Sequence, residues 1–328
     1  MIFILSQMRK ENNCLWMVKG ISCILVILFH CPIKGILGDG IIYALRFPIP
    51  IFFMSTGYFI YRKANYFDKI RVFLKYLVFA ETISFISLII KSIFTSSFDI
   101  IVSALRTAFS LKTLFFGSMF NGTLWYLYAM VWTYLILYIL SKLQHGFEMG
   151  YASIVVLLFI HIAGRVYVTE HYDINEWVFL FRSSLLFAVP FVLIGRYIAE
   201  MEALLRKYLN WYSISGIFCF GILLMIVEYI LWHRFMDLQV STIFISIALF
   251  LFALYKPDFQ LLGILKYIGK NLLLYVYIFH IPVITIAKLF LHRFGCESQN
   301  FTTLIVVVCT LGLSYIWVML KTKRHMKS

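Results

Sequence analysis

The sequence predicts an all-α integral membrane protein with about ten transmembrane helices and both termini in the cytoplasm. Three observations predict this fold class. The 328 residues are 62% hydrophobic and only 13% charged, whereas soluble domains are about half apolar and a quarter charged. The apolar residues lie in runs long enough to cross a bilayer, which takes about 20 residues per helix. The basic residues gather in alternate connections between those runs.

The expected helices follow the apolar runs in chain order. They cover residues 15–33, 41–61, 72–94, 122–141, 151–168, 178–199, 211–231, 239–255, 267–290 and 301–320. Most connections are short, and the longest, near 95–121, is a candidate interfacial segment. No soluble appendage and no internal repeat is visible, so we expect a single membrane domain over 1–328, with translation beginning at Met1 or Met8.

The distribution of Lys and Arg sets the expected orientation. With the N-terminus inside, nineteen of the 29 basic residues fall on the cytoplasmic side, in agreement with the positive-inside rule. The same rule accounts for most of the net charge of +14, so we expect no nucleic-acid partner. We expect a bilayer as the partner of the apolar surface, and the sequence leaves the oligomeric state open.

The six cysteines show neither a disulfide framework nor a metal-binding spacing. We expect free thiols, with a single bridge between Cys31 and Cys296 as the alternative. We expect no bound metal.

The first apolar run contains two ionisable residues, Lys19 and His30. Eleven residues turn an α-helix by about 1100°, so the two side chains share one face, about 16 Å apart along the axis. A cation near the inner boundary and an imidazole near the outer one suit a long ligand with a phosphorylated head and a reactive tail. The alternative is a lysine that snorkels to the interface and a histidine that is merely solvated. Ionisable residues inside a membrane favour the functional interpretation.

Further motifs follow in chain order. "FFMSTGYF" supplies Phe52, Phe53, Gly57 and Tyr58, with Thr56 among them. A basic segment, "YRKANYFDKIRVFLKY", comes next, followed by "GTLWYL" and "FAVPFVLIGRYI". Near the C-terminus, "YIGKNLLLYVYIFHIPVI" contains Gly269, Asn271, Tyr275, His280 and Pro282.

With Lys19 and His30, this ordered set resembles the acyltransferase family 3 membrane proteins, bacterial enzymes that O-acylate cell-surface glycans and related molecules. The likeness runs along nearly the whole chain. Two residues depart from the commoner pattern: Lys19 stands where Arg is usual, and Thr56 stands where Ser is usual. Lys keeps the charge but lacks the bidentate fork of Arg for phosphate.

The resemblance implies transfer of an acyl group, acetyl by default or succinyl, from cytoplasmic acetyl-CoA or another acyl-CoA to an acceptor hydroxyl. It also implies a multi-pass protein of the bacterial inner membrane. His30 is the expected general base, or the nucleophile that first accepts the acyl group. Lys19 is expected to assist at the inner end of the same face. His280 is expected to orient His30 or to bind the acceptor, unless it is a packing histidine.

The donor phosphates are expected to meet the basic segment on the inner side. Its cations are Arg62, Lys63, Lys69, Arg71 and Lys75. Arg71 and Lys75 are the favoured pair, because positions i and i+4 share a helix face. Some of the five are expected to serve the positive-inside rule alone.

The acceptor contacts are expected from residues elsewhere in the apolar runs. Trp125 and Tyr126 can stack on a sugar or form an interfacial belt. Arg182 can hold an anionic acceptor or face lipid headgroups. Glu81 and Glu228 lie inside apolar runs, where each can pair with a buried cation or fix a histidine tautomer.

The main competing function is an exporter of polysaccharide or lipid-linked sugar without acyl transfer. A transporter has no need of the Lys19 and His30 pair or of the basic segment, and it would more readily show an internal repeat. A receptor is a third interpretation, disfavoured because no soluble output domain is visible. The nature of the acceptor, whether capsule, lipopolysaccharide, exopolysaccharide or a small molecule, stays open.

Overall fold

The computed structural model describes residues 12–35, 46–61, 65–108, 110–117, 119–232, 238–296 and 298–325. Every regular element in these ranges is a helix, which confirms the all-α class. In chain order the elements are α1 (Asn13–His30), α3 (Pro48–Ile60), α4 (Tyr66–Thr95), α5 (Asp99–Ala108), α6 (Leu111–Phe116), η1 (Gly122–Leu124), α7 (Trp125–Lys142), α8 (Gly146–His171), α9 (Ile174–Phe181), η2 (Ser184–Ala188), α10 (Val189–Glu200), α11 (Glu202–Tyr208), α12 (Trp211–Trp232), α13 (Val240–Tyr255), α14 (Gly263–Tyr267), η3 (Ile268–Leu272), α15 (Leu273–Arg293) and α16 (Gln299–His325).

The helices begin where the sequence supplies caps. The side chain of Asn12 accepts a hydrogen bond from the Leu15 amide at the start of α1, and Asn65 does the same for the Asp68 amide in α4. Pro48 and Pro190 lie in the first turns of α3 and α10, where a missing N–H costs nothing. Local sequence therefore fixes these boundaries, and the apolar runs fill the interiors.

Seven of the described helices are long and apolar enough to cross a membrane, or eight when α10, with η2, and the bent α11 count as one span. The sequence predicted about ten spans, and a helix of the structure lies in every one of the ten apolar runs. The two that fall short are α3, with 13 residues, and α13, with 16 residues. Each is shorter than the roughly 20 residues that a hydrocarbon core of about 30 Å requires.

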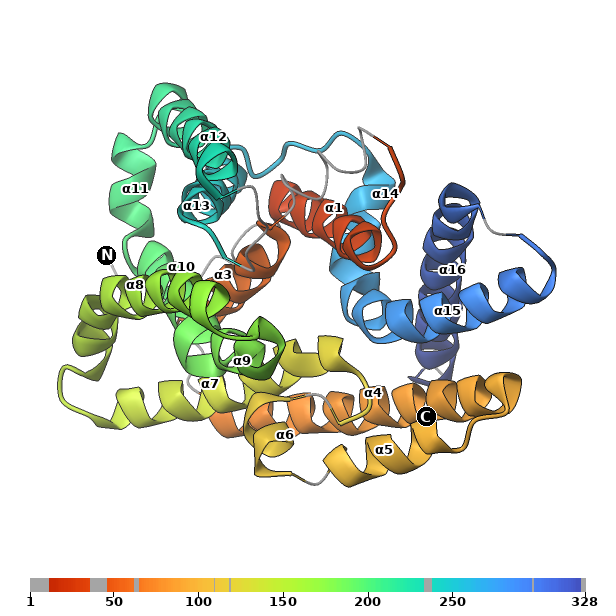
Figure 1. Cartoon of the computed structure of the whole chain (residues 1–328). Helices are drawn as coiled ribbons and strands as arrows, with labels where there is room; N and C mark the ends of the chain where they lie inside the picture. Colours follow the sequence, from red (N-terminus) through yellow and green to blue (C-terminus); the bar gives the residue numbers. More distant parts are fainter. Residues whose placement is uncertain are drawn as a thin grey trace.

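Helices α1 and α3 lie in the middle of the bundle (Figure 1). Helix α3 packs along α10, while α12 pairs with α13, α15 with α16, and α4 with α7. The short helices α5 and α6 lie between α4 and η1 in sequence and pack on α4 and α7. They occupy the connection near 95–121 that the sequence singled out.

Glycines set the closest helix contacts. A Cβ atom on Gly57 would meet the backbone of Val192, and one on Gly195 would meet Met54, so α3 and α10 touch backbone to backbone. Gly20 and Gly269 make a second contact of this kind, between α1 and η3. Small residues at such crossings are typical of membrane helices. They hold α1, and with it Lys19 and His30, at a fixed position in the bundle.

The described cysteines are all free thiols, as expected. Cys31 lies at the end of α1, where its sulfur is 3.5 Å from the hydroxyl of Thr303 on α16.

Candidate active site

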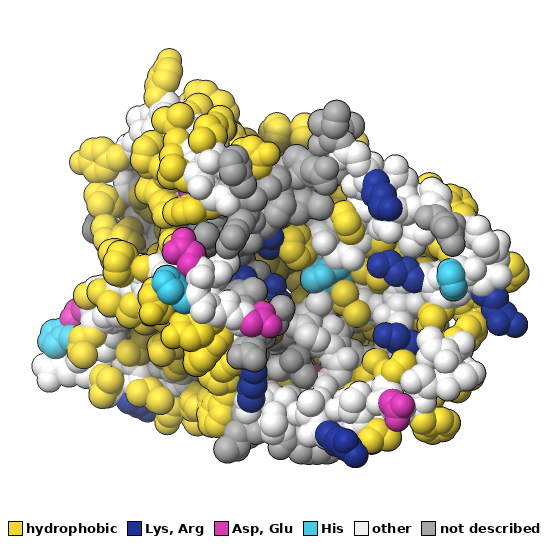
Figure 2. Space-filling view, viewed as in Figure 1, with side chains coloured by type: hydrophobic (Ala, Val, Ile, Leu, Met, Phe, Trp, Pro, Cys, Tyr) yellow, Lys and Arg dark blue, Asp and Glu magenta, His cyan; other side chains and the backbone are white. Residues whose placement is uncertain are grey.

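A cavity opens at one end of the bundle beside His30. It encloses about 580 Å³, mouth included, and its lining residues are Val26, Phe29, His30, Arg46, Pro48, Ile49, Thr123, Trp125, Arg182 and Phe187. They come from the C-terminal end of α1, from the start of α3 and the residues just before it, from η1 and the start of α7, and from the segment 182–187 that includes most of η2. Figure 2 shows a hollow near the middle of this face, with basic and histidine side chains at it. Four separate segments of the chain thus contribute side chains to one site.

His30, which lines this cavity, lies beside His280, which is buried behind the wall. Their ring centroids are 5.2 Å apart. The Nδ1 atom of His280 lies 2.7 Å from the carbonyl oxygen of Tyr277, which can only accept, so Nδ1 carries the proton in this contact. The Nε2 atom of neutral His280 is then an acceptor, and it is buried without a hydrogen-bond partner among the described residues.

Tyr277 connects this histidine to the opposite wall. Its hydroxyl donates to the carbonyl of Thr123, which lines the cavity. The side chain of Asn121 accepts from the Thr123 amide at 3.0 Å and from the Thr123 hydroxyl at 2.8 Å. The hydrogen bond from Tyr277 therefore connects α15 to the turn that precedes α7, and it helps to position His280.

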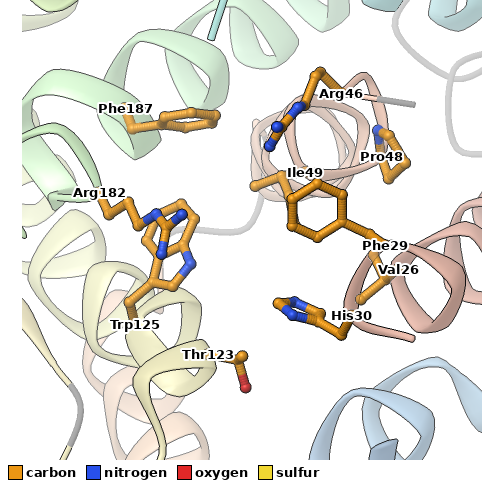
Figure 3. Close-up of a pocket in the computed structure, with 10 residues that line it drawn as sticks. All are labelled: Val26, Phe29, His30, Arg46, Pro48, Ile49, Thr123, Trp125, Arg182 and Phe187. Atoms are coloured by element: carbon orange, nitrogen blue, oxygen red, sulfur yellow. The ribbon is translucent and has the colours of Figure 1, made fainter. Parts of the chain in front are cut away.

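Two arginines line the cavity. Arg182 was expected near an acceptor, whereas sequence reasoning missed Arg46, which precedes α3. The Arg46 guanidinium lies 4.4 Å from the ring centroid of Phe29, and the Phe29 ring is edge-on to His30 at 5.1 Å. The sequence did contain a signal for Arg46, because an ionisable residue inside an apolar run, here 41–61, is a candidate functional residue. Figure 3 shows Arg182 and His30 reaching into the cavity from opposite sides.

The two neighbouring aromatic candidates take different places. Trp125 lines the cavity, with its ring 5.4 Å from that of Phe187. Tyr126 is buried behind the wall, 4.6 Å from the Phe53 ring and 5.5 Å from the Tyr277 ring. Successive helix residues point in directions about 100° apart, which explains why only one of the pair reaches the cavity.

Lys19 lies on the same uninterrupted helix as His30, so the shared face and the rise of about 16 Å hold in the structure. Its ammonium group is 4.3 Å from the centroid of the Trp16 ring. Lys19 itself is absent from the cavity wall, whereas Val26, on the face between the two residues, belongs to it. Lys19 thus lies at one end of a helix face whose other end reaches the cavity.

The basic segment lies apart from this cavity. Lys69, Arg71 and Lys75 are on exposed turns at the start of α4, and the guanidinium of Arg71 is 3.5 Å from Asp68. Arg62 and Lys63 fall outside the described residues. A second cavity of about 780 Å³, mouth included, is lined by Lys75, Tyr76, Phe79, Tyr275, Trp317, Leu320 and Lys321. Lys75 there joins a lysine from α16 that sequence reasoning did not single out.

The two carboxylates in apolar runs bind backbone. Glu81 accepts from the amides of Met119 and Phe120, at 3.3 and 3.1 Å, and from the Tyr128 hydroxyl at 2.9 Å. Glu228 accepts from the Val240 amide at 2.7 Å, at the start of α13. A buried carboxylate needs such donors. The structure brings neither residue to the cavity wall.

Comparison with models of protein families identifies the family of this chain. The model of an acyltransferase domain, that of acyltransferase family 3, matches residues 12–322. The chain belongs to acyltransferase family 3. It is therefore an acyltransferase, and its long apolar helices make it a multi-pass membrane enzyme. Comparisons with curated proteins and with solved structures give no significant match.

The family 3 motif residues of this enzyme divide into two groups in the structure. His30 and His280 adjoin the cavity, whereas Gly57 and Gly269 make the close backbone contacts that position the helices. Tyr275 lines the second cavity and lies 3.2 Å from the ammonium of Lys321. Some motif residues of this acyltransferase thus serve helix packing, whereas others line or adjoin the two cavities.

Proposed function

We propose that this enzyme moves an acyl group, acetyl by default, from cytoplasmic acyl-CoA to a hydroxyl of a cell-surface or exported glycan. The observation that carries the proposal is the placement of His30. It stands in a cavity beside the buried His280 and at the opposite end of the helix face that begins at Lys19. We place the enzyme in the bacterial inner membrane.

The predicted orientation in the membrane supports a donor site on the cytoplasmic side and an acceptor site on the outer side. The proposed topology adds the two shorter apolar helices, α3 and α13, to the seven long helices and the bent pair, which makes ten crossings. With cytoplasmic termini, the end of α1 and the starts of α3, α7 and η2 all lie at the outer side. The acceptor then enters the His30 cavity from outside, while Lys19 faces the cytoplasmic half.

The donor is proposed to enter from the cytoplasmic side. Its phosphates need cations, and Lys19, Lys75 and Arg71 provide them on inner turns, with Arg62, Lys63 and Lys69 nearby in sequence. The second cavity adds Lys321 and aromatic side chains that suit a nucleotide. A pantetheine arm is comparable in length with the roughly 16 Å from Lys19 to His30. The arm can thus bring the thioester to the outer cavity.

The chemistry proposed for His30 is proton transfer. Its imidazole removes the proton of the acceptor hydroxyl, the oxygen attacks the thioester carbonyl, and the C–S bond breaks to release CoA, which takes up a proton. The alternative order transfers the acyl group to the His30 nitrogen first and then to the hydroxyl. His280 is a positioning residue in both orders. Trp125 offers a flat surface for a sugar ring.

Replacement of His30 by Ala tests the proposal. Loss of a general base typically lowers the rate by about 10²–10⁴. The variant should fold and bind acetyl-CoA like wild type, yet transfer almost no acyl group to the native glycan of the host. His171→Ala is the matched control, because His171 is an exposed histidine at the far end of α8. Near wild-type transfer by His30→Ala would refute the assignment.

A further inference from the structure

We propose that the His30 cavity takes an anionic acceptor, a glycan unit that carries a carboxylate or a phosphate group close to the hydroxyl that receives the acyl group. The proposal rests on the proposed function and names the acceptor class for the same site. Its basis is the pair of arginines, Arg46 and Arg182, that line this cavity together with the base.

The two guanidinium groups reach the cavity from different parts of the chain. Arg46 precedes α3, and Arg182 lies between α9 and η2. Figure 3 shows Arg182 beside Trp125 on one side, and His30 with Phe29 on the other, with Arg46 at a third edge. A ligand that occupies the space between them has guanidinium groups on two sides and the imidazole on a third.

Packing holds one of these charges next to the base. The Arg46 guanidinium is stacked 4.4 Å above Phe29, and the Phe29 ring lies edge-on to His30 at 5.1 Å. An anionic group bound by Arg46 is therefore placed beside His30. The reacting hydroxyl must lie near that anionic group in the acceptor, and this constraint narrows the class of sugar.

The charge balance of the wall favours a negative ligand. Among the described residues that line the cavity, two are arginines and none is acidic. Each guanidinium has five N–H donors, so a protein neighbour that uses some of them leaves others for a ligand. A carboxylate or phosphate compensates the two positive charges with charge-assisted, bidentate hydrogen bonds.

The remaining walls of the cavity suit a sugar ring at its open mouth. Trp125 and Phe187 offer aromatic surface, and Thr123 adds a hydroxyl. These residues can hold a sugar ring while the arginines hold its charge.

A different role for the arginines is stabilisation of the tetrahedral oxyanion during transfer. That role acts only in the transition state, so it gives no preference for anionic over neutral ligands in equilibrium binding. Equilibrium binding therefore separates the two roles. It also separates this proposal from the proposed function, which is tested by transfer in the His30→Ala protein.

The experiment measures the thermal unfolding temperature, Tm, of the purified full-length enzyme with three sugars at equal concentration. Methyl glucuronoside carries a carboxylate, glucose 6-phosphate carries a phosphate, and methyl glucoside is neutral. We expect at least one anionic sugar to raise Tm and methyl glucoside to leave it unchanged. Titration of the shift should give an affinity about ten- to a hundredfold higher for the anionic sugar. Whether methyl glucuronoside or glucose 6-phosphate raises Tm shows whether the cavity recognises a carboxylate or a phosphate.

Variants assign the effect to the cavity. Arg46→Gln and Arg182→Gln should each remove most of the shift, and Arg182→Lys should keep part of it because the charge remains. Arg206→Gln is the matched control, since Arg206 pairs with Glu202 on α11, away from the cavity. The Tm of each variant without sugar reports whether it folds. Absence of a shift with both anionic sugars, an equal shift with methyl glucoside, or a shift that survives both arginine-to-glutamine changes would each overturn the proposal.

Discussion

The rings of His30 and His280 lie 5.2 Å apart at the contact of α1 with α15, and the Nδ1–H of His280 is held by the carbonyl of Tyr277. This backbone contact fixes the tautomer of His280 and directs the acceptor atom Nε2 of its neutral ring to the other side of the ring. The buried histidine therefore has one defined acceptor atom. Its substitution should alter the behaviour of the imidazole of His30 more than the fold.

His280→Ala is expected to lower the turnover number about 10- to 100-fold, the range known for groups that orient ligating histidines. The KM for acetyl-CoA should stay within about twofold, and the pH profile of the residual transfer should shift, because the group that titrates has lost its neighbour. The measurement is the pH–rate profile of the purified variant. A uniform loss of activity that follows loss of folded protein would show that His280 serves packing alone.

Lys19→Ala is expected to weaken acetyl-CoA binding, and the loss should be larger at low salt, where a charge contact is less screened. Lys19→Arg should retain activity, since Arg keeps the charge and adds a fork for phosphate. Binding isotherms at two ionic strengths provide the measurement. Lys142→Ala, at the C-terminal end of α7, is the control for a general effect of positive charge on the side that we predict to be cytoplasmic. An equal effect in both alanine variants would contradict a specific phosphate contact at Lys19.

Glu81→Ala is expected to destabilise the enzyme by about 1–3 kcal/mol for each buried donor left without a partner. The carboxylate holds the amides of Met119 and Phe120, which lie a few residues before the cavity residues Thr123 and Trp125. Thermal unfolding should thus occur at a lower temperature, and turnover should fall with it. Glu148→Ala, a change on an exposed side chain at the start of α8, should leave both quantities near wild type.

Gly57→Ala is expected to destabilise the fold by about 1–3 kcal/mol, because its added Cβ atom meets the carbonyl of Val192 in α10. Gly216→Ala in α12 is the matched control, since a Cβ atom there meets nothing within 4 Å. Alanine is the better helix former, so the control should be neutral or slightly stabilising. Equal unfolding temperatures of the two variants would show that α3 and α10 separate at little cost.

Reporter fusions after Lys63 and at the C-terminus are expected to report a cytoplasmic location. A fusion after Tyr172, at the end of α8, should report the opposite side, because the positive-inside bias places that end outside. A periplasmic signal after Lys63 or at the C-terminus would contradict the topology. The location of the His30 cavity at the outer face would then need to be revised.

The sequence was enough to predict the all-α class, the position of every long helix and the shared face of Lys19 and His30. Those features depend on local composition and on a fixed rise and turn per residue. Arg46 was missed because its role arises from contact with Phe29 and from the return of α3 beside α1, which one chain segment does not reveal. Glu81 was misjudged for the same reason, since its partners are amides on a distant loop.

The motif glycines illustrate a second limit of sequence reasoning. Gly57 and Gly269 were quoted among residues that indicate an enzyme family, but a pattern does not tell a packing residue from a reacting one. Only the structure shows that each lies against the backbone of another helix. Seven or eight long spans, where ten were predicted, have a simple cause as well: α3 and α13 are too short by themselves to cross a full hydrocarbon core.

The two glycine contacts have an evolutionary consequence. They fix α1 against η3 and α3 against α10 at points that do not belong to the cavity lining. Side chains of the lining can therefore be exchanged without displacing the helix that carries the imidazole. If the cavity binds the acceptor as proposed, gene copies can diverge in what they modify through a few substitutions in the wall while they inherit the same scaffold.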